Sequence, residues 1–280
     1  MVFVWLITGT SSGYGRELTL AALKRGDRVI ATARPQSFEE LVDIEEQGAD
    51  ILELDVTDTL DNLRAVAEEA VNLYGHVDVV VNNAGYAQVT CLEEATPEDT
   101  FNQFNTNVFG GLNVARAFLP HMRVRKSGTV LWIGCATSWK PSGYSGLYLA
   151  SKAAVRTLSK SLHEEIEAFG LRSICIEPTS MRTSFMSPGH RIFGGTRSIV
   201  EEYRDGIETI AYSFDLLDGK QPGDPTKAAE ATVDLVKSEG HVSGRDPPSM
   251  VCLGASDTIR DACDSTLQML NGWDFDVSVY

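Results

Sequence analysis

Short runs of β-branched and apolar residues alternate along this chain with longer segments of helical periodicity. This alternation constrains the fold more than any other feature. The expected strands are residues 2–8, 29–33, 51–54, 79–81, 130–133, 173–176 and 250–253. The expected helices are residues 14–25, 38–47, 58–74, 98–122, 145–169, 225–238 and 256–270. Strands and helices that alternate in this way predict an α/β fold built on a doubly wound parallel sheet.

The alternation continues without a Pro/Ser-rich linker before about residue 184, so we expect a single domain over residues 1–280. The stretch 184–224 mixes glycines with apolar residues where a compact alternation needs only a short connection. We therefore predict that 184–224 forms a lid over a substrate site. Residues 254–280 are expected to close the chain with a helix and a tail.

Charge and apolar runs exclude several classes of partner. The chain carries 24 Lys and Arg against 39 Asp and Glu, a formal net charge of −15, which argues against a nucleic-acid partner. The longest apolar run covers residues 1–7, far short of the roughly 20 residues that a membrane-spanning helix requires. Five cysteines without a Cys-x-x-Cys pair, and no leader-like start, predict reduced thiols and a cytoplasmic location. The histidine spacing predicts no metal site.

A glycine-rich turn joins the first expected strand to the first expected helix. A turn of this kind lets backbone amides and the positive end of the helix approach a diphosphate closely, although a purely structural turn is the alternative. Its position after the first strand favours nucleotide binding and a Rossmann-type three-layer sandwich. Tyr14 lies between two of the glycines, and its role is open between packing and cofactor contact. The candidate cofactor-binding residues of this turn are Gly9, Ser11, Ser12, Gly13, Tyr14 and Gly15.

The end of the second expected strand indicates which dinucleotide binds. A carboxylate that grips the ribose hydroxyls is normal at this place, but the chain has Ala33 followed by Arg34. An arginine offers a planar, charged fork to a 2′-phosphate, so NADP(H) is the predicted cofactor, unless Arg34 is an ordinary solvated arginine. Asp55 and Val56, after the third strand, are candidates for the adenine end. Asp55 equally fits a turn that begins before Thr57.

Two further motifs predict chemistry at the same edge of the sheet. Asn83, Ala84 and Gly85 follow the fourth strand, where open α/β sheets bind ligands, although a simple turn is again possible. Tyr148 and Lys152 are four residues apart on an expected helix and therefore share one face. An ammonium near a phenol favours the phenolate and lowers the pKa of the phenol, as acid–base catalysis requires. Pairs with this spacing also occur through packing alone.

Together these motifs resemble the short-chain dehydrogenase/reductase family over residues 2 to about 183. The resemblance implies that Tyr148 donates or accepts the proton and that Lys152 holds the nicotinamide ribose and tunes Tyr148. It implies that Asn107 kinks its helix and holds a water that relays protons to Lys152. Met181 and Thr183 would contact the nicotinamide carboxamide. The segment that carries this end of the cofactor site includes Pro178, Thr179, Met181 and Thr183.

The chain departs from the family pattern at two positions. Cys135 stands where the family has a serine thirteen residues before the tyrosine, and a thiol is a weaker hydrogen-bond donor than a hydroxyl. Cys135 fills the role poorly, or Thr137 or Ser138 replaces it, or Tyr148 acts alone. A free cysteine is also an ordinary small buried residue. The second departure is Thr179, where the family has glycine.

These observations predict an NADP(H)-dependent oxidoreductase that acts on a largely apolar ketone or secondary alcohol. Trp139, Tyr144 and Phe185 are candidates for the walls of the substrate pocket, although packing explains each equally well. The resemblance implies a homodimer or homotetramer through the helices at 98–122 and 145–169. A catalytically weak NADP(H)-binding sensor or scaffold, and an epimerase or isomerase of the same family, are the alternatives.

Overall fold

Seven parallel strands form the central sheet of the protein. The computed structural model describes residues 1–187, 191–193 and 200–273. The order across the sheet is β3-β2-β1-β4-β6-β7-β9, and every pairing is parallel. The strands are β1 (Val4–Thr8), β2 (Arg28–Ala33), β3 (Asp50–Glu53), β4 (Val79–Asn82), β6 (Gly128–Ile133), β7 (Leu171–Pro178) and β9 (Met250–Leu253). The predicted α/β fold with a doubly wound parallel sheet in a single domain is confirmed, because all seven expected strands are present.

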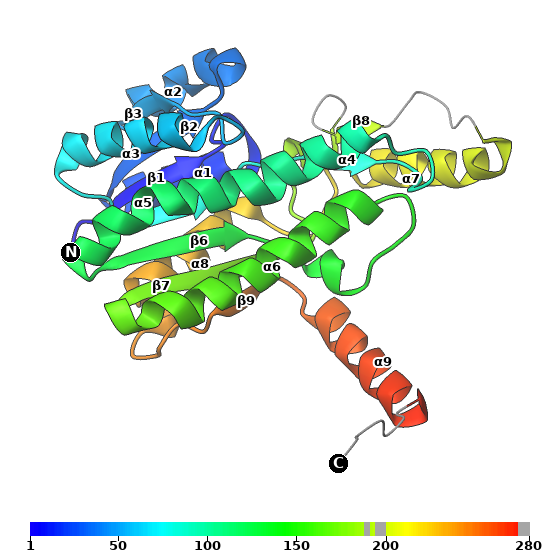
Figure 1. Cartoon of the computed structure of the whole chain (residues 1–280). Coiled ribbons are helices and arrows are strands. Elements are labelled where there is room, and N and C mark those ends of the chain that lie inside the picture. The colour runs from blue at the N-terminus through cyan, green and yellow to red at the C-terminus, as the bar shows by residue number, and fades with distance from the viewer. Residues whose placement is uncertain (188–190, 194–199, 274–280) are drawn as a thin grey trace.

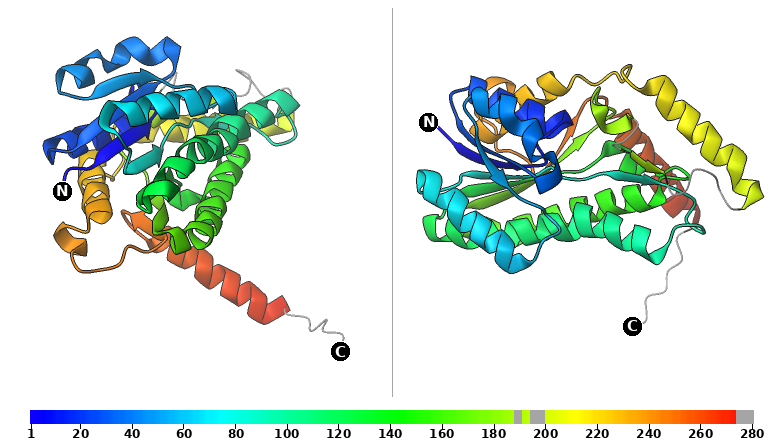
Figure 2. Two further views of the ribbon diagram at one scale, coloured as in Figure 1. Left: turned by 60° about the vertical axis from the view of Figure 1, so that its left-hand side comes forward. Right: turned by 90° about the horizontal axis from the view of Figure 1, so that it is seen from above.

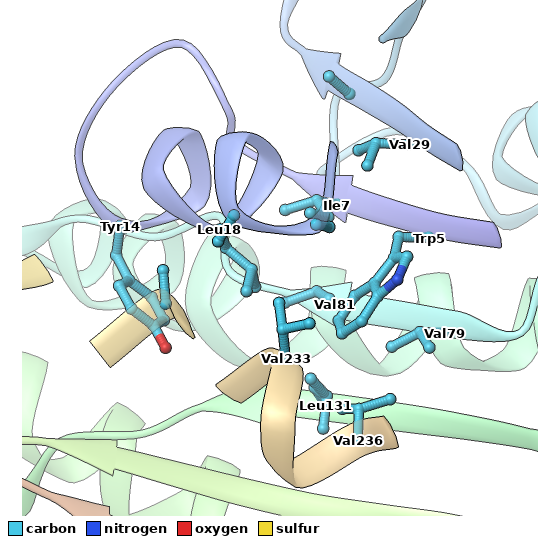
Figure 3. Packing of buried hydrophobic residues seen from close by; sticks show 14 of the residues in the cluster. Trp5, Ile7, Tyr14, Leu18, Val29, Val79, Val81, Leu131, Val233 and Val236 are labelled. Carbon is cyan, nitrogen blue, oxygen red and sulfur yellow. The ribbon is translucent and has the colours of Figure 1, made fainter. Parts of the chain in front are cut away.

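Helices cover both faces of this sheet and complete the three layers (Figure 1). One face carries α1 (Gly13–Lys24), α2 (Val42–Glu46) and α8 (Pro225–Lys237). The other face carries α3 (Leu60–Tyr74), α5 (Gly111–Arg125) and α6 (Gly146–Ile166). Each face has its own apolar core, and Figure 3 shows Leu18 of α1 and Val233 of α8 packed near Trp5 of β1.

Strand β1 lies in the middle of the sheet, and its sequence reflects burial on both sides. Trp5 and Ile7 belong to the core under α1 and α8, whereas Val4 and Leu6 belong to the core under α3 and α5. All five residues of β1 are buried. A strand covered on both faces needs apolar side chains at every position, which explains the continuous apolar run at the start of the chain.

The predicted helix over 98–122 is interrupted around Asn107, where the family resemblance implied a kink. The structure has α4 (Pro97–Phe104), a π-helical segment Asn105–Gly110 and then α5. The two glycines at the junction allow the helix to approach the sheet closely. A β-carbon on Gly110 would lie 2.7 Å from the carbonyl oxygen of Val56, and one on Gly111 would lie 3.2 Å from the Trp132 ring. The wide turn and the close approach bring Asn107 to the edge of the sheet.

The predicted lid contains regular structure that the sequence pattern did not indicate. Within it lie helix α7 (Arg204–Leu217) and strand β8 (Arg191–Phe193), which pairs in parallel with β5 (Ala87–Val89). Residues 188–190 and 194–199 of this stretch, and 274–280 of the predicted tail, lie outside the described residues. Helix α7 extends beyond the sheet at the end towards which the strands point (Figures 1 and 2).

The last helix, α9 (Asp257–Trp273), projects away from the body of the molecule (Figure 2). Its first half packs against the segment Ala136–Trp139. Leu267, Met269 and Leu270 farther along it are more than half exposed. None of the helices in the described part of the chain is long and apolar enough to cross a membrane.

Candidate active site

The carboxyl ends of β1 and β4 form the centre of the site. These strands are neighbours in the sheet, and the chain continues from β1 towards β2 on one side and from β4 towards β6 on the other. In open α/β sheets such a reversal of strand order leaves a crevice that binds ligands. The loops that follow Thr8 and Asn82 therefore lie side by side at this crevice.

Asn83 joins these two loops to each other. Its side-chain Nδ2 donates to the carbonyl oxygens of Thr8 (2.8 Å) and Gly9 (3.0 Å). The Thr8 hydroxyl accepts hydrogen bonds from the backbone amides of Asn83 and Ala84, both at 3.0 Å. The Asn83 side chain thus fixes the position of the glycine loop at this crevice.

The glycines of the first loop leave room that any other side chain would fill. Gly9 has φ +70°, and a β-carbon there would lie 2.9 Å from Cα of Ala84. A β-carbon on Gly15 would lie 2.6 Å from the carbonyl oxygen of Gly9 and would also collide with the Asn83 amide. Ser11 and Ser12 precede α1, and in the described structure no side chain caps this helix at Ser12. The uncapped amides and the open backbone fit the diphosphate of a dinucleotide.

The side chain of Tyr14 packs inside the protein. Its hydroxyl forms a 2.6 Å hydrogen bond with the Thr232 hydroxyl of α8 and lies 3.3 Å from the carbonyl oxygen of Ala228. Burial raises the pKa of Tyr14, and the Thr232 hydrogen bond offsets part of this rise. Of the two roles that the sequence left open, the structure shows packing between α1 and α8 (Figure 3).

The residues predicted at the adenosine end lie along the ends of β2 and β3. Ala33 is buried, and Arg34 is exposed at the start of the segment Pro35–Leu41. Asp55 Oδ1 accepts from the backbone amide of Thr57 (2.9 Å) and from its hydroxyl (2.6 Å), so Asp55 forms the turn that was its alternative role. Val56 is buried at the same corner, against Gly110.

Tyr148 and Lys152 share one face of α6, as their spacing predicted. The Lys152 Nζ lies 5.9 Å from the centre of the Tyr148 ring and donates a 2.7 Å hydrogen bond to the carbonyl oxygen of Ile133. Burial raises the pKa of Tyr148 well above its usual value and lowers the pKa of Lys152. Burial is the largest cause of the raised pKa of Tyr148 in this arrangement.

Cys135 is the residue after β6 that faces the phenol. The electrostatic interaction of the Cys135 thiol with Tyr148 adds to the rise in the pKa of Tyr148. Thr137 is exposed, and the Ser138 hydroxyl is buried and accepts a 2.8 Å hydrogen bond from Arg156. Among the three residues considered for the serine role, Cys135 is thus the one that interacts with Tyr148.

The side chain of Asn107 is held by three hydrogen bonds to protein groups. Its Nδ2 donates to the carbonyl oxygen of Tyr86 (3.0 Å) and to the Ser151 hydroxyl (3.0 Å). Its Oδ1 accepts from the backbone amide of Tyr86 (3.1 Å). A β-carbon on Gly85 would lie 3.0 Å from this Oδ1 and 3.6 Å from the Lys152 Nζ. The π-helical segment therefore places Asn107 next to Lys152 and the loop after β4.

The loop after β7 borders the crevice opposite the glycine turn. Pro178 ends β7, and the next residue, Thr179, hydrogen-bonds through its backbone amide (3.0 Å) and hydroxyl (3.3 Å) to the carbonyl oxygen of Leu253. Met181 pairs with Gly223 at the end of the lid segment. Thr183 lies across from Gly13, with 3.6 Å between its Cβ and a β-carbon placed on that glycine. Thr183 is thus the residue of this loop that adjoins the glycine turn.

The three predicted pocket aromatics occupy different surroundings. The Phe185 ring lies 5.5 Å from the Tyr148 ring, so Phe185 is beside the acid–base pair. Tyr144 has φ +64°, and its hydroxyl lies against Gly206 of α7, where a β-carbon would collide with it. Trp139 donates through Nε1 to Glu177 and lies under the Arg156 guanidinium, 4.1 Å from its ring centre.

A buried ion pair behind Cys135 was missed by sequence reasoning. Arg156 Nη1 lies 3.1 Å from Glu177 Oε1, and the side chain of Glu177 is completely buried. The same guanidinium reaches Ser138 and Trp139, so the pair holds the segment that follows Cys135. The only signal in the sequence was a carboxylate directly before Pro178, at the end of an otherwise apolar strand.

The fold and the family-typical motifs at this crevice define an α/β oxidoreductase with a Rossmann-type fold. The family model described as short chain dehydrogenase matches residues 4–190, and the chain belongs to this family. It acts on small molecules and uses the nicotinamide cofactor typical of the family. Among the residues that the structure describes, no group of three or more His, Cys, Asp or Glu side chains is arranged to hold a metal ion.

Several known oxidoreductases are similar to this chain in sequence or structure. The oxidoreductase claN of Passalora fulva is 38% identical over 196 residues, which cover 68% of this chain and 88% of the relative. The 3-ketodihydrosphingosine reductase of Bacteroides thetaiotaomicron is 34% identical over 180 residues, 64% of each chain. A short-chain dehydrogenase from Streptomyces avermitilis superposes with a TM-score of 0.82 at 34% identity, covering 98% of this chain and 97% of its own.

Proposed function

We propose that this protein is an NADP(H)-dependent reductase of a largely apolar ketone, running in the reverse sense as an alcohol dehydrogenase. The observation that carries this proposal is the placement of Tyr148 beside Lys152 on one face of α6, next to a glycine-lined crevice. The raised pKa of Tyr148 keeps the phenol protonated at neutral pH. A protonated phenol is the form that donates to a carbonyl oxygen when a ketone is reduced.

Backbone and side-chain groups of the crevice bind the cofactor. The reduced nicotinamide of the bound cofactor would supply the hydride. Gly9, Gly13 and Gly15 leave space for its diphosphate against the uncapped start of α1. Arg34, exposed at the end of β2 where no carboxylate follows, would bind a 2′-phosphate. Thr183 would hold the nicotinamide end from the opposite wall.

The acid–base step is assigned to residues of α6 and its neighbours. Tyr148 donates its proton to the ketone oxygen, and the Lys152 ammonium stabilises the phenolate that results. Cys135 donates a weak hydrogen bond to the same oxygen, since a thiol is a poorer donor than a hydroxyl. Asn107 positions the α6 helix through Ser151.

An apolar substrate is supported by the walls of the site. Phe185 lies directly beside Tyr148, and Tyr144 and α7 stand at the entrance. The relative from Bacteroides thetaiotaomicron is named as a reductase of 3-ketodihydrosphingosine, a ketone with a long hydrocarbon chain. The segment 184–224 would close over such a substrate and exclude water.

The decisive test compares NADPH with NADH oxidation by the purified protein across a panel of apolar ketones and diketones. Tyr148→Phe serves as the blank. NADPH consumption that matches the alcohol formed, and that disappears in Tyr148→Phe, is the expected result. NADPH binding without turnover of any ketone would favour a sensor or scaffold, and turnover without net NADPH consumption would favour an epimerase or isomerase.

Assembly and location belong to the same proposal. The faces of α4, the π-helical segment and α5 expose Phe101, Phe109 and Val124, and we expect a homodimer or homotetramer to bury them. Light scattering coupled to size exclusion measures the mass directly. All five cysteines are free, which fits a reducing compartment such as the cytoplasm.

A further inference from the structure

One buried side chain at the end of β4 has polar atoms that the described protein groups leave unsatisfied. Asn82 is 8% exposed, and neither its Nδ2 nor its Oδ1 has a hydrogen-bond partner among the described residues. Buried amides are almost always paired with protein or with an internal water, because an unpaired one is costly. The position is crowded on one side, where Gly111 of α5 and Trp132 of β6 pack against it.

A small cavity lies in front of this amide. Its walls include Asn82, Lys152 and Asn107, together with apolar groups and backbone from β1, β6, α5 and α6. The cavity measures about 10 Å³, close to the smallest space that holds a single water molecule. A polar cavity of this size that meets several polar partners is a water site rather than an empty void.

The hydrogen bonds already made around the cavity show which groups face a water. Asn107 uses both amide hydrogens on Tyr86 and Ser151. The Thr8 hydroxyl donates to the carbonyl oxygen of Val81. Lys152 donates to Ile133, and an ammonium has three hydrogens, so it retains capacity. A water in the cavity can therefore donate a hydrogen bond to Asn82 Oδ1 and accept one from the Lys152 ammonium.

We propose that Asn82 holds one internal water against the Lys152 ammonium and thereby acts as a positioning residue for the Tyr148–Lys152 pair. The water accepts a hydrogen bond from Nζ and donates one to Asn82 Oδ1. The catalytic consequence rests on the proposed reductase function, whereas the water site itself does not. Asn107, whose side chain is occupied by Tyr86 and Ser151, supports the opposite side of the site.

The surroundings of Lys152 explain why such a water matters. The titratable groups that act on it are Tyr148 on its own helix, Cys135 after β6 and Cys175 on β7, none of which is a carboxylate. Burial lowers the pKa of Lys152. Hydrogen bonds from the ammonium to Ile133 and to the water then stabilise the charged form, which stabilises the phenolate left after proton donation.

The test uses Asn82→Leu, which keeps the approximate volume and removes the amide, and Asn82→Ser, which keeps a hydroxyl for the water. Ser159→Ala is the matched control, because it removes a buried hydroxyl on α6 that bonds to Ser173 outside the cavity. The first measurement is the NMR titration of the Lys152 side chain in the cofactor-free protein. We expect Asn82→Leu to lower its midpoint by about one pH unit, while Asn82→Ser and Ser159→Ala remain close to the unsubstituted protein.

The second measurement is the pH dependence of kcat for ketone reduction. In Asn82→Leu the alkaline limb moves to lower pH by about the same one unit as the Lys152 midpoint, and kcat falls by up to about tenfold at pH values above both midpoints, because Lys152 loses its proton earlier. The KM for NADPH is unchanged, and Asn82→Ser restores most of kcat. A purely structural role of Asn82 would lower kcat at every pH without moving the limb.

The outcomes separate this inference from the proposed function. An unchanged Lys152 midpoint in Asn82→Leu overturns the inference, whatever the activity. A shifted midpoint in a protein that reduces no ketone supports the water site and refutes the proposed reductase function. Where Asn82→Leu fails to fold, a high-resolution crystal structure of the unsubstituted protein decides. A water bonded to both Asn82 and Lys152 supports the inference, and a cavity without one refutes it.

Discussion

Replacing Arg156 by methionine tests whether the buried pair behind Cys135 organises the catalytic loop. Arg156→Met keeps an unbranched apolar stem but leaves Glu177 as a fully buried carboxylate, with the Trp139 N–H as its remaining hydrogen-bond partner among the contacts described above. Ser138 also loses its 2.8 Å donor. Removing one member of a buried ion pair costs about 3–5 kcal/mol of the free energy of unfolding. We expect a loss in that range, because the guanidinium is only 15% exposed.

The matched variants separate charge from packing. Glu177→Gln keeps an acceptor for Trp139 and Arg156 and should cost about 1–2 kcal/mol, the difference between a charged and a neutral hydrogen bond. The double variant contains no buried carboxylate, so its loss should be smaller than that of Arg156→Met alone, with a coupling energy of about 2–3 kcal/mol.

Urea denaturation at pH 7, with equal m-values across the four proteins, measures these differences. Steady-state kinetics on the same samples should show a lower kcat for Arg156→Met with an unchanged KM for NADPH. The reason is that Cys135 precedes the loosened segment, whereas the glycine turn lies elsewhere. Additive losses in the double variant, or a cost below about 1 kcal/mol for Arg156→Met, would refute the reasoning.

Four further predictions follow from single contacts in the site. Cys135→Ser should speed the chemical step of ketone reduction, since a hydroxyl is a better donor than a thiol; single-turnover kinetics showing an equal or slower rate would contradict this. Gly206→Ala should raise the KM for ketone, because a β-carbon there collides with the Tyr144 hydroxyl. Adding Tyr144→Ala to this variant should lower the KM again more than adding Tyr144→Phe, because the β-carbon also meets the Tyr144 ring. Arg34→Ala should weaken NADPH binding measured by calorimetry by about tenfold or more and leave NADH nearly unchanged; equal losses for both would argue against 2′-phosphate recognition. Burial raises the pKa of Cys175 to about 12 from an ordinary value near 9, so the stabilising contribution of its neutral thiol is complete below pH 9 and lost as pH rises from there towards 12. Between pH 8 and 10 the free energy of unfolding of Cys175→Val should therefore fall less than that of the unsubstituted protein. An equal fall in both proteins would contradict a raised pKa of Cys175.

The sheet could be predicted from the sequence because most of its strands are buried on both faces. Strand β1 is the clearest case, with five buried residues in a continuous apolar run. Strands β5 and β8 were missed because three residues are too short for a periodic signal and their pairing partners are distant in the chain. The apolar pattern did not indicate the π-helical segment before α5, because the helical periodicity continues through it. The kink at Asn107 was implied by the family resemblance alone, and Gly110 packs closely on Val56 there.

The motifs indicated which residues lie near one another at the edge of the sheet, but they could not show where each side chain points. Tyr148, Lys152 and Cys135 meet as their positions in the family pattern implied. The Asn83 side chain donates to the backbone of the glycine loop, and the Asp55 side chain accepts from the backbone amide of Thr57. Direction depends on contacts between segments far apart in the chain, and periodicity and spacing carry no information about these contacts.

The place of β1 in the sheet also affects how the protein is made. One edge of β1 pairs with β2, the next strand in the chain, but the other pairs with β4, which is synthesised only after β2, β3 and their helices. Until then the nascent chain carries an apolar strand with an open edge, and parallel pairings of this kind form slowly. Association of partly folded chains competes with the arrival of β4. Lower growth temperature or chaperone co-expression should therefore raise the yield of native protein more than any change at the surface of the finished fold.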